Sequence, residues 1–135
     1  NDEEARQLSG EYSLVKAAKI ILAMGLKYLI IKKGEHGALL FNKTEIFFAP
    51  ALPLEEVFDP TGAGDSFAGG FIGYLAKTND ISFENMKRAV INGSAMASFC
   101  VEKFGTKKLT EINKKDVDIR INEFVNLVQF DTPLK

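Results

Sequence analysis

The residue types best suited to chemistry in this chain lie between Asp59 and Asp65. The sequence there reads DPTGAGD and runs into an apolar stretch that predicts a helix to about Ala76. Gly62 and Gly64 allow a tight turn, since glycine tolerates positive φ, and the first N–H groups of a helix have no internal partner. The positive end of the helix dipole favours anions at the same place, so the turn predicts a phosphate site. Asp65 stands at that site, where a carboxylate can accept the proton of an attacking hydroxyl.

The same turn also has a purely structural interpretation. A glycine turn before a helix is common, and Asp65 is a favourable charge at any helix N-terminus. Other nucleotide motifs do not decide the question: the sequence contains no GxxxxGK[ST], and Phe67 stands where the third glycine of GxGxxG would fall. The glycines and the carboxylate alone leave both interpretations open.

The unbroken stretch DPTGAGDSFAGGF, residues 59–71, resembles the second signature of the PfkB carbohydrate kinase family. That family includes ribokinase-like sugar kinases and adenosine-type nucleoside kinases. The resemblance implies a Rossmann-like three-layer αβα fold of the ribokinase type, present here in part. It also implies ATP-dependent phosphate transfer to an alcohol group, with Asp65 as the catalytic base. The residues implied for the anion hole are Gly62, Ala63, Gly64 and Asp65.

Two weaker matches concern metal ions. Asn1-x-x-Glu4 resembles the NxxE motif of the family, which positions Mg²⁺ and phosphate, partly through water. The same two residues also fit a helix capping box. Asp59 and Thr61 lie where some relatives bind a monovalent cation, and K⁺ would suit their oxygen atoms, although Asp59 before Pro60 is equally an ordinary turn residue.

A third set of matches concerns ATP. Gly34-x-x-Gly37 follows an apolar run and resembles the GxxG turn on the nucleotide side of the family's site. Lys32 begins a lysine pair before this turn, where relatives often have a small polar and an apolar residue. Lys32 is therefore a candidate phosphate ligand, and its alternative is an ordinary solvated lysine. Asn92 and the loop around Gly105 match the region that encloses adenine in relatives.

The periodicity of the chain predicts the elements that position these residues. Helical spacing and caps predict helices over residues 1–9, 13–25, 65–76, 82–99 and 116–128. The apolar run Tyr28–Ile31 predicts a strand buried on both faces, as in a parallel sheet. Residues 38–41 and 45–49 predict two paired strands around Asn42-Lys43. Together these elements predict a layered α/β domain.

Composition limits the partners. The 135 residues are 46% hydrophobic and carry a formal net charge of -1, which predicts one globular domain. Basic residues do not cluster strongly, so nucleic acid binding has little electrostatic support. No apolar run approaches the roughly 18 residues of a membrane span. Cys100 is the only cysteine, and the acidic N-terminus lacks signal-peptide features, so we expect no intrachain disulfide and a cytoplasmic protein.

The resemblance covers nearly the whole chain but only the C-terminal half of a typical family member. Residues 1–135 are therefore expected to form the nucleotide-binding and catalytic portion, without the N-terminal half that supplies most of the acceptor pocket and its lid. A sugar is the expected acceptor and a nucleoside is the alternative. A nucleotide-binding module without turnover in this truncated form is an alternative of another class. The resemblance also allows a homodimer of the full-length protein.

Overall fold

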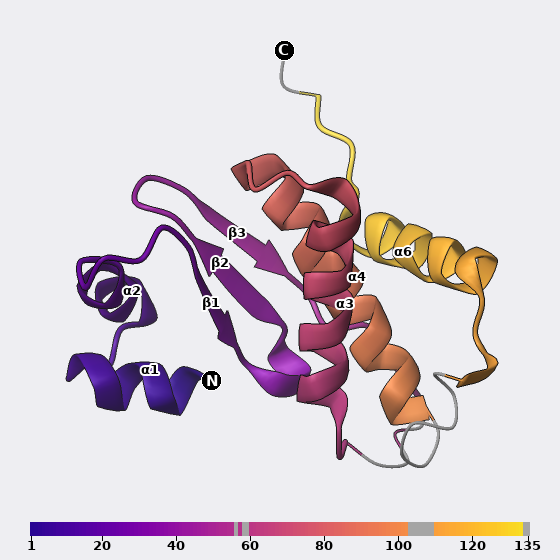
Figure 1. The fold of residues 1–135 in the computed structure, drawn as a ribbon, viewed down its shortest axis with the longest axis horizontal. Helices are drawn as coiled ribbons and strands as arrows, with labels where there is room; N and C mark the ends of the chain where they lie inside the picture. The colour runs from indigo at the N-terminus through magenta and orange to yellow at the C-terminus, as the bar shows by residue number, and fades with distance from the viewer. Residues whose placement is uncertain (56, 58–59, 103–109, 134–135) are drawn as a thin grey trace.

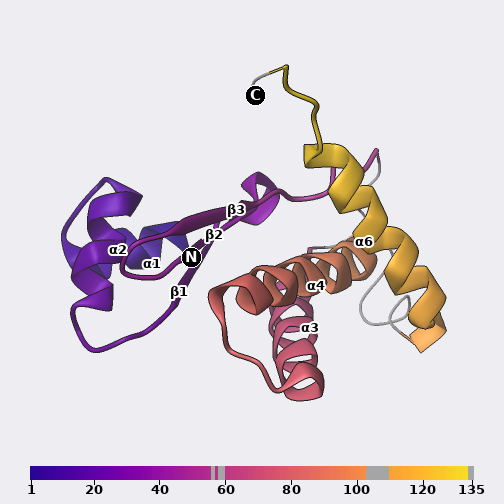
Figure 2. The same ribbon diagram turned by 90° about the horizontal axis from the view of Figure 1, so that it is seen from above.

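The structure is a computed structural model that describes residues 1–55, 57, 60–102 and 110–133. Its elements, in chain order, are α1 (Asp2–Ser9), α2 (Leu14–Leu22), β1 (Leu29–Lys32), the 3₁₀ helix η1 (Gly34–His36), β2 (Ala38–Phe41), β3 (Ile46–Ala49), α3 (Ala63–Thr78), α4 (Phe83–Glu102) and α6 (Lys114–Val128). The sheet lies between α1 and α2 on one face and α3 and α4 on the other (Figure 1, Figure 2). The predicted three-layer αβα arrangement is confirmed.

The described sheet is an antiparallel meander in the order β1-β2-β3. The parallel sheet suggested by the apolar run of β1 is therefore wrong for these strands. The turn between β1 and β2 is too short for a parallel crossover, which needs about a dozen residues or more. The run has a different cause: Ile31 packs on the side of α1 and α2, whereas Ile30 packs on the side of α3 and α4. Both faces of β1 need apolar residues because both are covered by helices.

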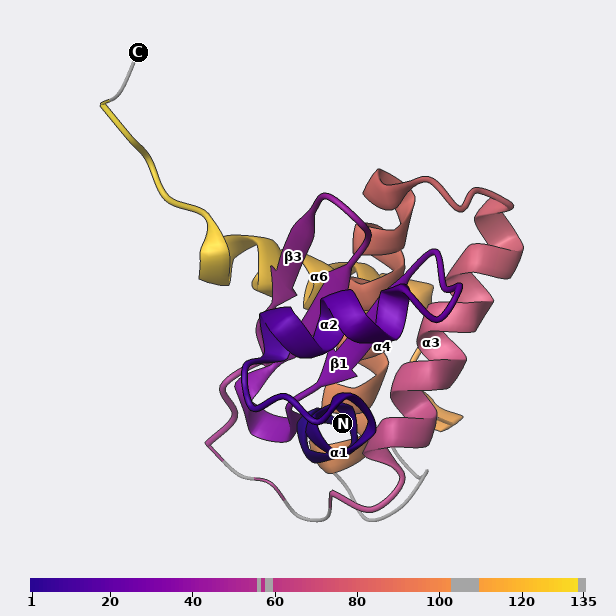
Figure 3. The same cartoon turned by 90° about the vertical axis from the view of Figure 1, so that its left-hand side faces the viewer.

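Each face of the sheet has its own hydrophobic core. The buried residues between the sheet and helices α1 and α2 are Ala5, Ala18, Ile21, Leu22, Ile31 and Phe41. Those on the opposite face are Ala38, Leu40, Ala49, Phe67, Met86 and Val90. Figure 3 shows α1 and α2 in front of the sheet. This layering brings the end of β1, the η1 turn and the start of α3 to one end of the molecule (Figure 1).

The helix boundaries follow their capping residues. The predicted N-caps are confirmed at Ser13, Ser82 and Asn113, whose side chains accept the backbone N–H three residues further on. Helix α2 ends at Leu22, earlier than the predicted stop at Gly25. Helix α3 runs beyond its predicted end to Thr78, because Asn79 adopts the left-handed conformation (φ 48°) that terminates a helix. Among the described helices, none combines the length and the apolar character needed to cross a bilayer.

Candidate active site

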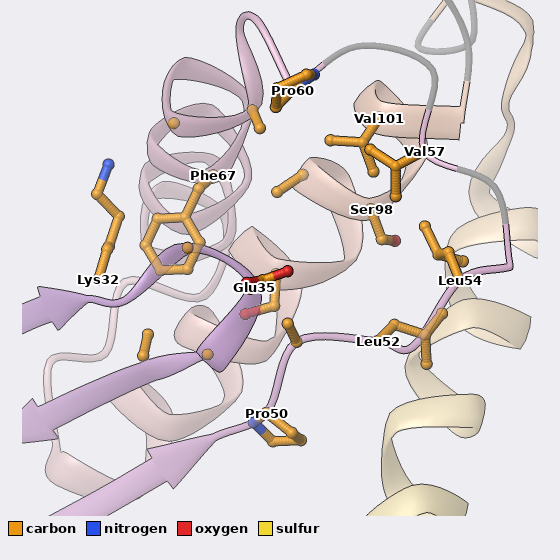
Figure 4. A pocket seen from close by; sticks show the side chains of 18 of the residues that line it. Lys32, Glu35, Pro50, Leu52, Leu54, Val57, Pro60, Phe67, Ser98 and Val101 are labelled. Atoms are coloured by element: carbon orange, nitrogen blue, oxygen red, sulfur yellow. The ribbon is translucent and has the colours of Figure 1, made fainter.

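A cavity of about 770 Å³ opens where β1 ends and α3 begins (Figure 4). Lys32 and Gly64 lie at its polar end, together with Asn1. Its other walls are mainly apolar and come from the connection after β3 and from the C-terminal half of α4: Pro50, Leu52, Leu54, Val57, Ala97 and Val101. A cavity with apolar walls and a few convergent polar groups is a typical small-molecule site. Glu35 also lines this cavity, and the ammonium group of Lys32 at one end favours a ligand with an apolar body and an anionic end.

The first turn of α3 forms part of the polar end. Gly62 is the N-cap and has a left-handed backbone (φ 83°, ψ −3°). The N–H of Ala63 donates to the carbonyl oxygen of Pro60 at 3.1 Å, so Ala63 is already satisfied. Among the described residues, no acceptor meets the N–H groups of Gly64 and Asp65. These two groups and the helix dipole leave the turn able to bind an anion.

The buried thiol of Cys100 packs against the turn that precedes α3. Cys100 on α4 is fully buried, and its Sγ lies 3.5 Å from the carbonyl oxygen of Thr61. The same sulfur would lie 3.6 Å from a Cβ built on Gly62. The sequence indicated only that Cys100 belongs to an apolar run, and nothing in its spacing reveals this contact with a turn about forty residues earlier in the chain.

Asp65 is the third residue of α3 and is exposed. It does not line the cavity, whereas its neighbours Ala63 and Gly64 do. The carboxylate is therefore beside the anion site and remains accessible to a second molecule. This is the position that a general base needs when the group it deprotonates approaches a bound phosphate from outside.

The predicted GxxG turn lines the same cavity. Gly34 and Gly37 both have positive φ, at 56° and 87°, and the N–H of Lys33 donates to the carbonyl of Gly37 at 2.7 Å. A Cβ on Gly37 would lie 2.3 Å from the carbonyl oxygen of Ala49, so only glycine fits there. The structure thus brings Lys32, Gly34 and Gly37 together with the start of α3, although they lie about thirty residues apart in the sequence.

The Asn1–Glu4 pair forms a capping box at the start of α1. The side chain of Asn1 accepts the N–H of Glu4 at 2.8 Å, and the amino group of Asn1 donates to the Glu4 carboxylate at 2.6 Å. The hydrogen bond from the Asn1 nitrogen is the main cause that holds the pKa of Glu4 below its ordinary value, and the charge of Lys32 adds a smaller contribution. Asn1 also lines the cavity, so its capping role does not remove it from the cavity wall.

The described residues offer few side chains that could bind a metal ion together. No three His, Cys, Asp or Glu side chains cluster in the part of the chain that the structure describes. The oxygen atoms of Asn1 and Glu4 nevertheless suit Mg²⁺, which commonly keeps several waters and binds through one or two protein groups and substrate phosphates. The residues present therefore fit a magnesium ion that is held mainly by phosphate and water.

Other predicted site residues are not brought to the cavity. Asn92 lies on α4 where that helix meets α3, and its amide donates to the carbonyl of Arg88 at 2.8 Å. Thr61 is exposed beside the anion turn and does not line the cavity. Asp59 and Gly105 lie outside the described residues. Sequence reasoning missed the apolar wall after β3, whose signal was an apolar segment with two prolines that fitted neither a helix nor a strand.

An αβα fold with free N–H groups at a helix N-terminus, next to an apolar cavity, is typical of α/β proteins that bind phosphate-containing small molecules. The sequence profile of the pfkB family carbohydrate kinases matches residues 1–113. The chain belongs to this family.

Individual relatives agree with this assignment. The chain is 31% identical over 123 residues to the ribokinase of Staphylococcus aureus, covering 84% of this chain and 39% of that protein. It is 44% identical over 74 residues to the cytidine kinase of Thermococcus kodakarensis, covering 53% of this chain and 26% of that protein. The chain thus spans well under half the length of these curated relatives.

A solved structure shows the same fold. The aminoimidazole riboside kinase of Salmonella enterica, in complex with aminoimidazole riboside and an ATP analog, superposes with a TM-score of 0.73 at 29% identity. The match covers 89% of this chain and 40% of that one. The structural similarity therefore extends over most of this chain.

Proposed function

We propose that this chain is the nucleotide-binding and catalytic portion of an ATP-dependent kinase that phosphorylates an alcohol group of a small molecule. The observation that carries the proposal is the cavity whose polar end meets the first turn of α3. The family assignment supports the class of reaction. The cavity supports a nucleotide position next to the proposed anion site. The acceptor is a separate question.

In this proposal the base of ATP lies against the apolar wall formed by Leu52, Leu54 and Val101 (Figure 4). The phosphates run along the Gly34–Gly37 turn toward the start of α3. The terminal phosphate meets the anion hole at residues 62–65, where the N–H groups of Gly64 and Asp65 are the available donors. Such preorganised donors stabilise charge that develops during transfer.

Asp65 acts as the general base. The acceptor hydroxyl oxygen attacks the γ-phosphorus, and the bond between that phosphorus and the β,γ-bridging oxygen breaks as ADP leaves. The hydroxyl proton goes to the carboxylate of Asp65. The exposure of Asp65 outside the cavity supports this role, since the acceptor must reach the phosphate from the side opposite the nucleotide.

Two cations complete the proposal. Mg²⁺ near Asn1 and Glu4, held through water and phosphate, would supply neutralising charge to the triphosphate. A monovalent cation such as K⁺ near Asp59 and Thr61 remains a prediction from the family resemblance. The chain's own residues bind the nucleotide, orient its phosphates and hold the proton.

A sugar is the acceptor that we favour, in line with the family and with the similarity to a ribokinase. A nucleoside is a second candidate, because the identity to the cytidine kinase reaches 44% over its aligned residues. Activity of a full-length kinase containing this chain toward a panel of sugars and nucleosides would decide between them. Nucleotide binding without turnover on any acceptor would favour the third possibility, a binding module.

Thermal unfolding of the chain with and without Mg·ATP tests the nucleotide site. Ligand at a hundredfold above Kd adds about 2.7 kcal/mol to the free energy of unfolding. A rise of several degrees in Tm is therefore expected for a domain of this size. A folded sample whose Tm does not respond to Mg·ATP, ADP or AMP would contradict a nucleotide site in this chain.

The Asp65→Asn variant of a full-length kinase tests the base. Asparagine keeps the shape of the side chain but cannot accept the proton, so kcat should fall on the order of 100-fold or more. The affinity for ATP should stay nearly unchanged, because Asp65 does not line the cavity. Near-normal turnover of Asp65→Asn would reject Asp65 as the base.

A further inference from the structure

The Lys32 side chain reaches from the sheet to the first turn of α3. Alternate residues of β1 face opposite helical layers, and Ile30 and Lys32 face α3 and α4. The Lys32 Nζ would lie 3.1 Å from a Cβ on Gly64, and it is 5.8 Å from the centre of the Phe67 ring. Figure 4 shows Lys32 beside Phe67 at the edge of the cavity.

This ammonium group has no ion-pair partner in the described part of the chain. None of the ion pairs between described residues includes Lys32. Its charge reaches Glu4, whose pKa it helps to lower, but without direct contact. Lys32 is half-buried, so water screens its charge less than at an open surface.

The neighbour of this cation is itself positive. The start of α3 carries the positive end of the helix dipole, and the N–H groups of Gly64 and Asp65 have no acceptor among the described residues. An ammonium group placed beside the N–H groups of a helix N-terminus is electrostatically unfavourable, and the nearby carboxylates of Asp65 and Glu35 form no ion pair with Lys32 among the described residues. An anion bound at this place satisfies both groups at once.

We infer that Lys32 binds the terminal phosphate of the nucleotide and neutralises its charge as it is transferred. This inference rests on the proposed function and adds a specific ligand to it. The apolar walls of the cavity lie at the end away from Lys32 and the first turn of α3. A nucleotide whose base contacts those walls therefore has its terminal phosphate, the phosphate farthest from the base, next to Lys32. In this step the hydroxyl proton passes to Asp65.

The adjacent lysine gives a matched control. Lys33 follows directly in the sequence but does not line the cavity. Affinities for adenosine, ADP and ATP, each with Mg²⁺, are measured by calorimetry on the wild type, Lys32→Gln and Lys33→Gln. A hydrogen bond to a charged group contributes about 1.5–3 kcal/mol, so Lys32→Gln should bind ATP about 10- to 100-fold more weakly. ADP should lose less, and adenosine and the Lys33→Gln variant should change less than about twofold.

The outcomes separate the inference from the proposed function. A wild type that binds none of the three compounds contradicts the proposed nucleotide site itself. A wild type that binds ATP while Lys32→Gln and Lys33→Gln behave alike overturns the role of Lys32 and leaves the proposed function standing.

A measurement on the wild type covers the case in which Lys32→Gln does not fold. The ε-carbon NMR signal of Lys32 should shift on addition of ATP and much less on addition of ADP or adenosine. An equal response to all three compounds rejects contact with the terminal phosphate. In a full-length kinase, Lys32→Gln should lower kcat as well as raise the KM for ATP, whereas a role limited to ground-state binding would raise KM alone.

Discussion

A Cβ placed on Gly70 would lie 3.1 Å from the Cα of Gly93. Helices α3 and α4 therefore meet at a distance that only small residues allow. A Cβ on Gly93 would in turn lie 2.8 Å from the carbonyl oxygen of Phe67, whose ring lines the cavity. This contact fixes the first turns of α3 against α4, and with them the anion site and the adjacent wall of the cavity.

Gly93→Ala should destabilise the fold. The added methyl group must displace the backbone of α3 at Phe67, and overpacking of this kind costs about 1–3 kcal/mol. Urea unfolding followed by circular dichroism measures the change. Gly69→Ala is the matched control, because a Cβ at Gly69 meets nothing within 4 Å. Alanine there should stabilise α3 by up to about 1 kcal/mol through its better helix propensity. A Gly93→Ala variant as stable as Gly69→Ala would show that the helices separate without strain.

Asn85 should stabilise the connection between α3 and α4. It is 3% exposed, and its amide donates to the Thr78 hydroxyl and to the carbonyl of Asp80, both at 2.7 Å. Asn85→Ala removes both bonds, but the acceptors are exposed and water can replace the amide. The loss should therefore be about 1–2 kcal/mol in the free energy of unfolding. Thr78→Val removes only one of the bonds and should lose roughly half as much. Equal losses in the two variants would place the effect elsewhere, for example in helix propensity.

Arg120 should hold α6 against α4. Its side chain is 11% exposed, pairs with Glu102, donates to the Ser98 hydroxyl at 2.7 Å and covers the Phe99 ring at 4.1 Å. Removing one partner of a fully buried ion pair costs 3–5 kcal/mol, and the partial exposure of Glu102 should reduce the loss in Arg120→Met to about 2 kcal/mol. Thermal unfolding tests this.

A surface ion pair on the same helix provides the control for Arg120. Lys114 and Asp118 lie 2.8 Å apart with exposed side chains, so Lys114→Met should change the free energy of unfolding by less than about 1 kcal/mol. Ser98 lines the cavity, so Arg120→Met should also weaken ATP binding modestly. Similar losses in the two variants would mean that the buried pair contributes no more than a surface pair.

The sequence predicted local features of the fold better than long-range ones. Caps such as Ser13 and Asn113 were found because a side chain and the backbone three residues away decide them. The direction of β1 was predicted wrongly, because a residue run shows that both faces are covered but not which strand pairs with it. Gly69, Gly70 and Gly73 of α3 look alike in the sequence, yet among these three only Gly70 contacts α4 closely.

For the candidate site, the sequence identified the residue types but not which of them lie close together in the fold. The glycine turn before Asp65 was visible because positive φ and a following helix are local properties. The proximity of Lys32 to Gly64 depends on how the sheet packs against α3, which no spacing along the chain reveals. Asn92 was matched to the adenine region on looser spacing, and the structure places this residue at the contact between α4 and α3.

Substitutions of Gly62 test whether the anion site depends on the left-handed backbone conformation of this residue. Its φ of 83° suits glycine, and a side-chain residue in this region costs roughly 1–2 kcal/mol, with asparagine tolerated better than alanine. Steric space is not the limit, since a Cβ there would lie 3.6 Å from the Cys100 sulfur, an ordinary contact. Both stability and the rise in Tm with Mg·ATP should therefore decrease in the order wild type, Gly62→Asn, Gly62→Ala, Gly62→Val.

The control for Gly62 is Gly73→Ala, because a Cβ at this helical glycine meets nothing within 4 Å. Gly73→Ala should retain the full response to Mg·ATP, which separates the backbone conformation at Gly62 from the general effect of a methyl group on α3. If Gly62→Ala and Gly62→Val lose stability but keep the ATP-induced rise in Tm, the strain is real and the turn is not the phosphate site. The nucleotide would then be held by the cavity without the N–H groups of α3, and Asp65 would lose its place beside the transferred phosphate.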